Sequence, residues 1–256
     1  MTTELLLYLT PFFLCLGSFL NVAGHRLIIG KSIVFPPSAC PHCKHFIAWY
    51  DNVPLLSWML LKGQCRSCRQ PISLLYPFIE LFTAVSLSLL AITVPLPYFF
   101  AYLIFFSALI VTIRSDLETM LISRMVTVYL IPLGLLFSWL KFLPITPVES
   151  MLGSIIGYLI LYLTAASFKY FMKKEGMGQG DLDLLAFIGA FVGPIGCWLT
   201  LLIASLVGSV VGMGYLTLSK QGRLAKIPFG PFLALGAMIY VLWGQWIMQL
   251  FLYGHF

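Results

Sequence analysis

Apolar segments long enough to cross a membrane recur along the whole chain, and they restrict its fold more than any other feature. A transmembrane helix needs about 20 apolar residues. Hydrophobic residues make up 60% of the sequence and charged residues only 9%, whereas a soluble domain carries roughly 25% charged residues. We therefore expect an all-α polytopic membrane protein with about eight transmembrane helices. The expected spans are approximately residues 5–28, 74–94, 98–113, 125–140, 150–171, 181–193, 197–218 and 228–252.

Two of these spans have an alternative interpretation. The first resembles a signal peptide, but no basic residue precedes it and no small-residue cleavage site follows it, so we expect a retained helix. The sixth reaches Gly193-Pro194 after about 12 residues, which is about 18 Å of helix and shorter than the roughly 30 Å apolar core. Either this helix continues through Pro194 with a kink, or its outer end lies below the interface.

The basic residues lie in alternate loops. Of the 15 Lys and Arg residues, Lys141 alone falls on the other side. The positive-inside rule places the basic loops in the cytoplasm and both termini outside. Because this topology accounts for the net charge of +6, we expect the lipid bilayer and not a nucleic acid as a partner. The loops carry Arg26, Lys31, Lys44, Lys62, Arg66 and Arg69; Arg114 and Arg124; Lys169, Lys173 and Lys174; and Lys220, Arg223 and Lys226.

A single long hydrophilic stretch divides the chain. We expect a first transmembrane helix in residues 1–28, a cytoplasmic zinc-binding loop domain in 29–73, and a seven-helix membrane core in 74–256. Small residues four apart allow membrane helices to pack closely, so the spans are expected to form one bundle. The pairs are Gly153 and Gly157, Gly189 and Gly193, and Gly208 and Gly212.

Two C-x2-C motifs in the hydrophilic stretch predict a metal site. Their spacing is typical of a zinc site with four thiolate ligands, and the reducing cytoplasm disfavours a disulfide. Such a metal would fold a loop that is too small for a core of its own. Free thiols or a redox pair are the alternatives, and His42 or His45 can replace a ligand. The predicted ligands of a zinc-ribbon-like domain are Cys40, Cys43, Cys65 and Cys68.

Carboxylates at the ends of two apolar segments are the candidates for chemistry. Asp181 follows Gly178-Gln179-Gly180 directly before the sixth span, and Asp116 follows the third. A carboxylate at the edge of a membrane segment is costly and usually functional, and the glycines allow close backbone approach. The ordinary alternative is a helix start with Asp181 as N-cap.

Two carboxylates that share one proton can hydrolyse a peptide without a metal. One deprotonates water while the other protonates the carbonyl oxygen. Asp116 and Asp181 both lie at cytoplasmic ends of spans and so can meet. Glu118 and Asp183 compete for these roles, but residues two apart on a helix point about 200° apart. At most one of each couple therefore faces the site. A transporter that uses the carboxylates as a proton relay remains an alternative.

Taken together, the motifs resemble one family, the bacterial type IV prepilin peptidases (prepilin leader peptidase/N-methyltransferases), which are aspartyl intramembrane proteases of the glycine-x-glycine-aspartate type. The resemblance covers nearly the whole chain in order, and the cysteine motifs together with Asp51-Asn52-x-Pro54 make it specific. The matching stretches are residues 17–22, 25–26, the two cysteine motifs, 51–58, 76–81, 178–181 and 227–232.

The resemblance implies an enzyme of the bacterial inner membrane, with periplasmic termini and an active site at the cytoplasmic face. Its substrates are type IV prepilins or type II secretion pseudopilins, whose leader it removes before methylating the new N-terminus with S-adenosylmethionine. Carried over to this sequence, the catalytic residues are Asp116 and Asp181. A non-catalytic assembly factor that only binds prepilins is a further alternative.

The chain departs from the family pattern at two places. Ser123-Arg124 stand where the family usually has Pro-Asp, and Asp183 stands where it usually has Lys. A lysine there would favour ionised Asp181, whereas Asp183 disfavours it. We expect Arg124 to restore the lost positive charge.

Four polar residues near the first two spans are candidates for the methyl-transfer region or for binding the substrate N-terminus: Asn21, Asp51, Asn52 and Glu80. Glu80 lies about two turns into the second span and needs a partner there. A structural hydrogen bond from Glu80 to Asn21 or His25 is the alternative. Because no glycine-rich motif marks a cofactor pocket, S-adenosylmethionine is implied by the resemblance alone.

Overall fold

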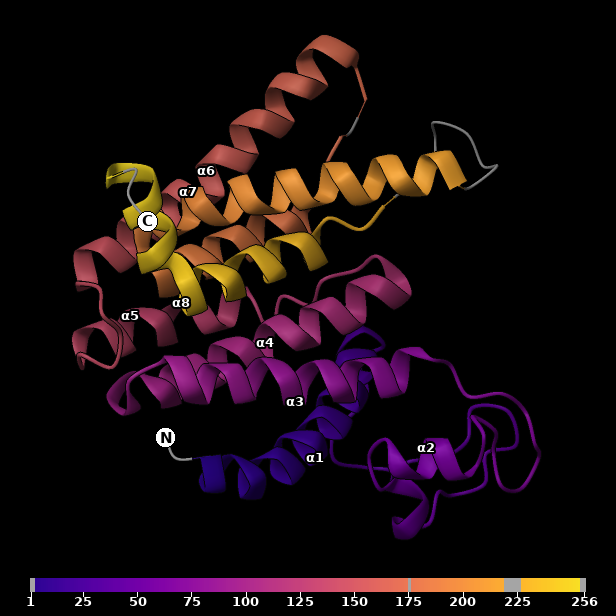
Figure 1. Ribbon diagram of the computed structural model, residues 1–256. Helices are drawn as coiled ribbons and strands as arrows, with labels where there is room; N and C mark the ends of the chain where they lie inside the picture. Colours follow the sequence, from indigo (N-terminus) through magenta and orange to yellow (C-terminus); the bar gives the residue numbers. More distant parts are fainter. Residues whose placement is uncertain (1–2, 175, 219–226, 254–256) are drawn as a thin grey trace. The chain divides into compact units, whose positions relative to one another are not determined.

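The computed structural model describes residues 3–174, 176–218 and 227–253, and in these residues it contains helices and isolated β-bridges but no β-strand (Figure 1). The expectation of an all-α fold is therefore confirmed. The chain forms two compact units, Met1–Thr93 and Val94–Phe256. The division into residues 1–28, 29–73 and 74–256 stays a prediction.

The first unit joins two long helices to a loop that carries short ones. Helix α1 packs along α3, and Gly17 allows their close approach, because a Cβ there would lie 3.0 Å from the Cα of Glu80. Residues 29–74 form the loop and contain the two short helices. The elements are α1 (Thr3–Ile28), η1 (Trp49–Asn52), α2 (Leu56–Leu60) and α3 (Leu75–Thr93).

The second unit is a helical bundle in which α7 packs against both α6 and α8. Helix α6 begins with a capping box, in which Thr146 and Glu149 bond each other's backbone N–H groups. The elements are α4 (Leu96–Thr119), η2 (Val128–Leu130), α5 (Ile131–Trp139), α6 (Pro147–Met172), α7 (Gln179–Leu218) and α8 (Gly230–Tyr253).

Helix α7 turns back on itself at Gly193. This residue has φ 72° and ψ −177°, a conformation open to glycine, and Pro194 follows it. A Cβ on Gly157 of α6 would lie 2.5 Å from the Leu185 carbonyl oxygen and 3.0 Å from the Cys197 sulfur. In a straight helix these two residues would be about 18 Å apart. The sixth and seventh predicted spans are therefore the two arms of α7, as Figure 1 shows in orange.

The expected number of about eight transmembrane helices is too high. Six helices in the described part of the chain are long and apolar enough to cross a membrane. Two predicted spans fall together in α7. The span predicted at residues 125–140 contains the 3₁₀ turn η2 and the nine-residue helix α5, because turns occupy much of residues 120–127. The predicted basic loop of Lys220, Arg223 and Lys226 lies outside the described residues.

Glycines bring α6 and α7 into backbone contact. A Cβ on Gly153 would collide with the carbonyl oxygen of Gly189, and one on Gly189 would collide with that of Gly153. Gly208 differs, because a Cβ there would lie 3.4 Å from the Phe232 ring, an ordinary van der Waals distance. Gly153, Gly157 and Gly189 therefore set a helix spacing, and Gly208 does not.

We predict that Gly153→Ala lowers stability and that Gly208→Ala does not. The added methyl at position 153 has to separate two backbones, which costs about 1–3 kcal/mol. At position 208 the substitution should raise the free energy of unfolding by roughly 0.5–1 kcal/mol, because glycine within a helix is less stable than alanine by that amount. Thermal unfolding of both variants in the same detergent checks this. Equal shifts in the unfolding temperature would contradict the packing described here.

Candidate active site and metal centre

The two carboxylates lie at matching distances from an aromatic contact between α4 and α7. The rings of Phe105 and Phe191 stack with their centroids 4.7 Å apart. Asp116 follows Phe105 by 11 residues and Asp181 precedes Phe191 by 10, which is about 16 and 15 Å of helix. At this end of the bundle the carboxylates are close enough for their charges to interact.

Asp116 is buried in the last turns of α4 and is held by the start of α8. Its side chain accepts a hydrogen bond of 3.1 Å at Oδ2 from the backbone N–H of Gly230. A Cβ at Gly230 would lie 2.7 Å from this oxygen. A side chain at position 230 would therefore displace the Asp116 carboxylate from this contact.

Asp181 lies in the first turn of α7, which begins at Gln179, and is therefore not the N-cap that the ordinary alternative assumed. Its N–H donates to the carbonyl of Gly178, and a helix N-terminus favours negative charge. Gly178 is exposed and Asp181 is partly exposed. A Cβ on Gly180 would lie 2.9 Å from that of Ile122, so this glycine permits close packing.

The two competing carboxylates have other partners. Glu118 is exposed and pairs with Arg114 at 2.7 Å. Asp183 is buried, and its Oδ1 accepts a 3.2 Å hydrogen bond from Gln179, which also donates to the hydroxyl of Tyr158. Glu118 and Asp183 therefore have partners away from Asp116 and Asp181, as expected for residues two apart on a helix.

Arg124 lies beside Asp183, as expected from the departures in the motif. Its Nε is 3.3 Å from Oδ2 of Asp183, an ion pair without the alignment of a hydrogen bond. The Arg124 side chain is 69% exposed, so solvent weakens the pair.

Arg114 was expected in a loop, which is wrong, because it is fully buried within α4. Sequence reasoning missed Arg114, Gln179 and Tyr158 as neighbours of the carboxylates. The i,i+4 spacing of Arg114 with Glu118 and of Gln179 with Asp183 could have indicated the first two, whereas Tyr158 lies on another helix.

The four cysteines of the loop converge on one point. Their sulfur atoms all lie within 4.8 Å of one another, and those of Cys40 and Cys68 are 3.8 Å apart. A zinc ion bound tetrahedrally at about 2.3 Å from each sulfur requires sulfur separations of about 3.8 Å. Within the described residues, the group that fits a metal contains cysteines alone and neither His42 nor His45.

The two cysteine motifs fold alike. In each, the N–H of the fifth residue donates to the carbonyl of the first cysteine, as Lys44 does to Cys40 and Arg69 to Cys65. Both of these fifth residues have positive φ, at 59° and 58°. An isolated β-bridge then closes each turn, between Ala39 and Phe46 and between Gln64 and Pro71. The turns direct both sulfurs of each motif toward the same centre.

The thiols already differ in acidity. The backbone N–H of Cys43 lowers the pKa of Cys40 to about 6. At Cys68 the N–H of Gln70 acts in the same direction, but burial and the neighbouring sulfurs outweigh it and raise the pKa to about 11. A cation among the sulfurs would favour all four thiolates, so the donor set fits a zinc ion.

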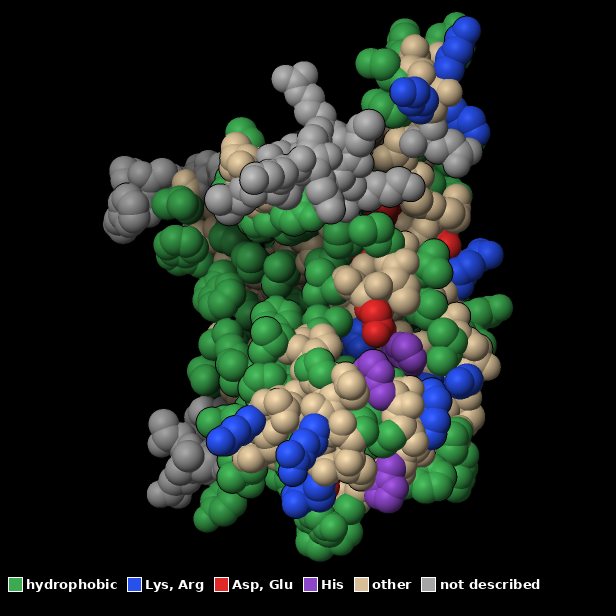
Figure 2. Space-filling model, turned by 90° about the vertical axis from the view of Figure 1, so that its right-hand side faces the viewer, with side chains coloured by type: hydrophobic (Ala, Val, Ile, Leu, Met, Phe, Trp, Pro, Cys, Tyr) green, Lys and Arg blue, Asp and Glu red, His purple; other side chains and the backbone are tan. Residues whose placement is uncertain are grey.

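Basic side chains surround this cluster. Lys31, Lys44, Lys62, Arg66 and Arg69 are exposed, and Figure 2 shows Lys, Arg and His side chains gathered on this loop. Asp51 is bound at both oxygens by Arg66, at 2.7 and 2.6 Å, and this guanidinium lowers the pKa of Asp51. Asp51 therefore links the segment between the two cysteine motifs to Arg66 of the second motif.

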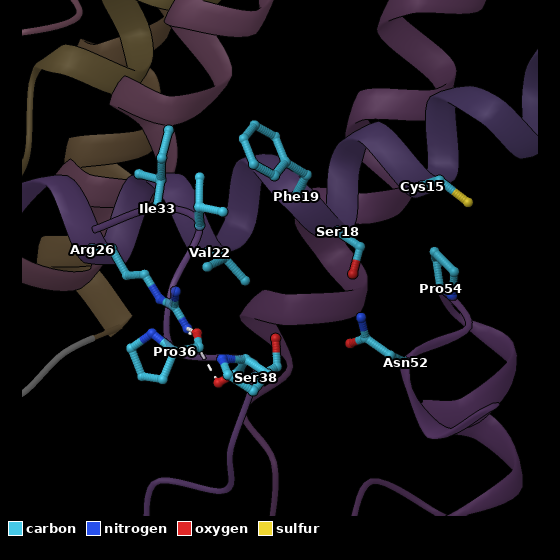
Figure 3. Close-up of a pocket in the computed structure, with 12 residues that line it drawn as sticks. Cys15, Ser18, Phe19, Val22, Arg26, Ile33, Pro36, Ser38, Asn52 and Pro54 are labelled. Atoms are coloured by element: carbon cyan, nitrogen blue, oxygen red, sulfur yellow. Dashed lines mark hydrogen bonds between the residues drawn. The ribbon is translucent and has the colours of Figure 1, made fainter. Parts of the chain in front are cut away.

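The remaining candidates lie around α1 and α3. Glu80 is buried and accepts a 2.9 Å hydrogen bond from the N–H of Leu55, and the Ser18 hydroxyl bonds it as well. Asn21 is buried and donates to the Tyr76 carbonyl at 3.0 Å. Asn52 lines a pocket (Figure 3). Glu80 thus ties the loop to the long helices, through partners that the sequence pattern did not indicate.

Comparisons with known proteins agree with these motifs. Residues 12–94 match the Bacterial Peptidase A24 N-terminal domain, and residues 103–213 match the Type IV leader peptidase family. No solved structure matches the chain.

Curated relatives match over nearly their whole length. A prepilin leader peptidase/N-methyltransferase of Aeromonas hydrophila is 37% identical over 94% of this chain and 91% of its own. One of Pseudomonas aeruginosa is 34% identical over 93% and 90%. A type 4 prepilin-like proteins leader peptide-processing enzyme of Escherichia coli is 34% identical over 88% and 89%. The chain therefore belongs to the type IV leader peptidase family, as its motifs indicated, and is a membrane peptidase of that family.

Proposed function

We propose that the chain removes the leader of type IV prepilins or type II secretion pseudopilins by an aspartyl mechanism and then methylates the new N-terminus. The observation that supports the mechanism most is the approach of Asp116 to Asp181, while Glu118 and Asp183 pair with Arg114 and Arg124. The names of the relatives support the substrate class and the methyl transfer.

In this mechanism the two carboxylates share one proton. The Gly230 N–H stabilises the charge on Asp116, and repulsion then keeps the proton on Asp181. Water attacks the scissile carbonyl carbon, Asp116 takes a proton from that water, and Asp181 gives its proton to the carbonyl oxygen. When the tetrahedral adduct collapses, the C–N bond breaks, Asp116 protonates the leaving nitrogen, and Asp181 recovers its proton from the hydroxyl group.

The second reaction is a methyl transfer to the amine that cleavage exposes. S-adenosylmethionine, when bound, would supply an electrophilic methyl group from its sulfonium to this amine in its neutral form, and the methylated amine would lose a proton to water. The residues expected to lie near it are Asn21, Asp51, Asn52 and Glu80.

We further propose that a structural zinc ion is held by Cys40, Cys43, Cys65 and Cys68, and that the site faces the cytoplasm of the bacterial inner membrane, with both termini periplasmic. Arg124, Lys173 and Lys174 follow or precede the two carboxylates closely in the sequence, and such residues remain on the cytoplasmic side. A proton-relay transporter or a non-catalytic prepilin-binding factor is disfavoured by membership of a peptidase family.

Asp116→Asn and Asp181→Asn are each predicted to lower prepilin cleavage by at least about 10³-fold, since each removes half of an acid–base pair. Glu118→Gln is the matched control and should stay within about fivefold of the unchanged protein. Mass spectrometry of a synthetic prepilin incubated with purified protein measures the released leader. Cleavage that survives in either aspartate variant would exclude the mechanism.

Arg124→Gln and Asp183→Asn are predicted to be non-additive. Each removes the same ion pair, so the double variant should lose no more activity than the worse single variant, with a coupling of about 0.5–1 kcal/mol because Arg124 is exposed. Initial rates of peptide cleavage for the four proteins give the coupling. Losses that simply add would show that the two charges act independently.

Zinc is predicted to copurify with the protein at one ion per chain. The double variant Cys65→Ser, Cys68→Ser should lose this zinc and unfold at a lower temperature, because the metal stabilises a loop that has no hydrophobic core of its own. Cys15→Ser, outside the cluster, should retain the ion. Elemental analysis of the purified proteins measures this. A full zinc complement in the double variant, or none in the unchanged protein, would refute the site.

A further inference from the structure

The loop of the first unit carries a short helix, α2, with an exposed apolar face. Leu56, Met59 and Leu60 are 60, 67 and 82% exposed, and their spacing places them on one side of the helix. Ser57 is buried on another side and donates to a backbone carbonyl of η1. In η1, which contacts α2, Trp49 is 83% exposed. Exposed apolar faces usually mark a contact with a protein or a membrane.

Hydrogen bonds hold the start of α2 alongside the two membrane-length helices of this unit. The Glu80 carboxylate of α3 accepts from the N–H of Leu55, directly before α2, and from the hydroxyl of Ser18 in α1. Ser18 lies ten residues before the end of α1, and Glu80 lies five residues after the start of α3. These separations correspond to about 15 and 8 Å of helix. Helix α2 therefore begins beside α1 and α3 and not beyond their ends.

The pocket between α1 and the loop shows the same arrangement (Figure 3). Asn52 and Pro54 lie at the Ser18 end of this pocket, whereas Ser38 lies at the Arg26 end. Ser18 and Arg26 are eight residues apart on α1, which is about 12 Å of helix. The segment before α2 therefore lies further back along α1 than the segment before the first cysteine motif.

Basic residues accompany this apolar face. Residues 29–74 contain five Lys or Arg residues and one acidic residue, Asp51, which gives a net charge of +4 with neutral histidines. Asp51 is already paired with Arg66. Lys62 follows α2 after one residue and is exposed. A helix with an apolar face and basic neighbours is typical of the lipid–water interface, where anionic headgroups attract Lys and Arg.

We propose that α2 and η1 bind an anionic lipid surface, with the side chains of Leu56, Met59, Leu60 and Trp49 in the lipid–water interface and Lys62 at the headgroups. The position of α2 alongside α1 and α3 favours lipid over a protein partner, because these two helices are surrounded by the same bilayer. The loop that carries the cysteine cluster is then held by the membrane surface as well as by α1 and α3. This inference does not depend on peptide cleavage or methyl transfer.

The test is photo-crosslinking of the full chain in vesicles of phosphatidylglycerol and phosphatidylcholine, with a synthetic prepilin present. Benzoylphenylalanine replaces Leu60 in one variant, Met59 in a second, and the exposed His42 of the first cysteine motif in a control. Mass spectrometry after irradiation identifies what each position contacts. We expect lipid adducts at position 59 or 60 to exceed those at position 42 at least about fivefold. Unfolding temperatures identify any misfolded variant, and either folded α2 variant is sufficient.

Lipid adducts that are no more abundant at positions 59 and 60 than at position 42 overturn the proposal. Adducts of these positions with the prepilin, with a second copy or with another part of the chain also overturn it, because α2 is then a protein-docking face.

Lys62→Gln tests the headgroup contact. The yield of lipid adduct at position 60 should fall at least about twofold in the anionic vesicles and stay unchanged in vesicles of phosphatidylcholine alone. An unchanged yield in the anionic vesicles, or an equal loss in both kinds of vesicle, overturns the assignment of Lys62 to anionic headgroups.

Discussion

The approach of α4 to the first arm of α7 is the contact on which the candidate chemistry depends. It is made by aromatic stacking of Phe105 on Phe191 in a fully buried position. Aromatic pairs of this kind contribute about 0.5–1.5 kcal/mol beyond the area they bury. Because Asp116 and Asp181 lie at nearly equal distances from this stack, packing in the bundle holds the two carboxyl groups at the same end of the bundle.

Glycines allow helices to approach one another closely at several places in the second unit. Gly153 and Gly189 bring α6 and α7 into backbone contact, Gly193 turns α7 back, and Gly230 approaches the Asp116 carboxylate. Each of these positions excludes a Cβ for a different reason, by a neighbouring backbone, by a positive φ, or by a carboxylate oxygen. Glycines therefore set the contact between α6 and α7, and Gly230 brings the start of α8 to the Asp116 carboxylate.

Patterns within short stretches of the sequence predicted the cysteine cluster and most of the long helices. The cysteine cluster followed from two C-x2-C spacings, and the apolar runs predicted α1, α3, α4, α6 and α8 as helices. The turn inside α7 was harder to foresee, because Gly193-Pro194 is compatible with a kink or a short span. The partners of Glu80 and Asp116 are backbone N–H groups of Leu55 and Gly230. No side-chain pattern identifies such donors, since every residue except proline carries one.

The proposed enzyme requires one carboxylate of the pair to be ionised and the other protonated at the same time. The most direct measurement is the pH dependence of kcat for cleavage of a synthetic prepilin between about pH 4 and pH 10, in protein shown to be folded throughout. The account predicts a bell-shaped profile, because activity falls when the base gains its proton and again when the acid loses its own. A rate that stays constant up to the alkaline end would mean that no protonated carboxyl takes part, and would contradict the shared-proton mechanism.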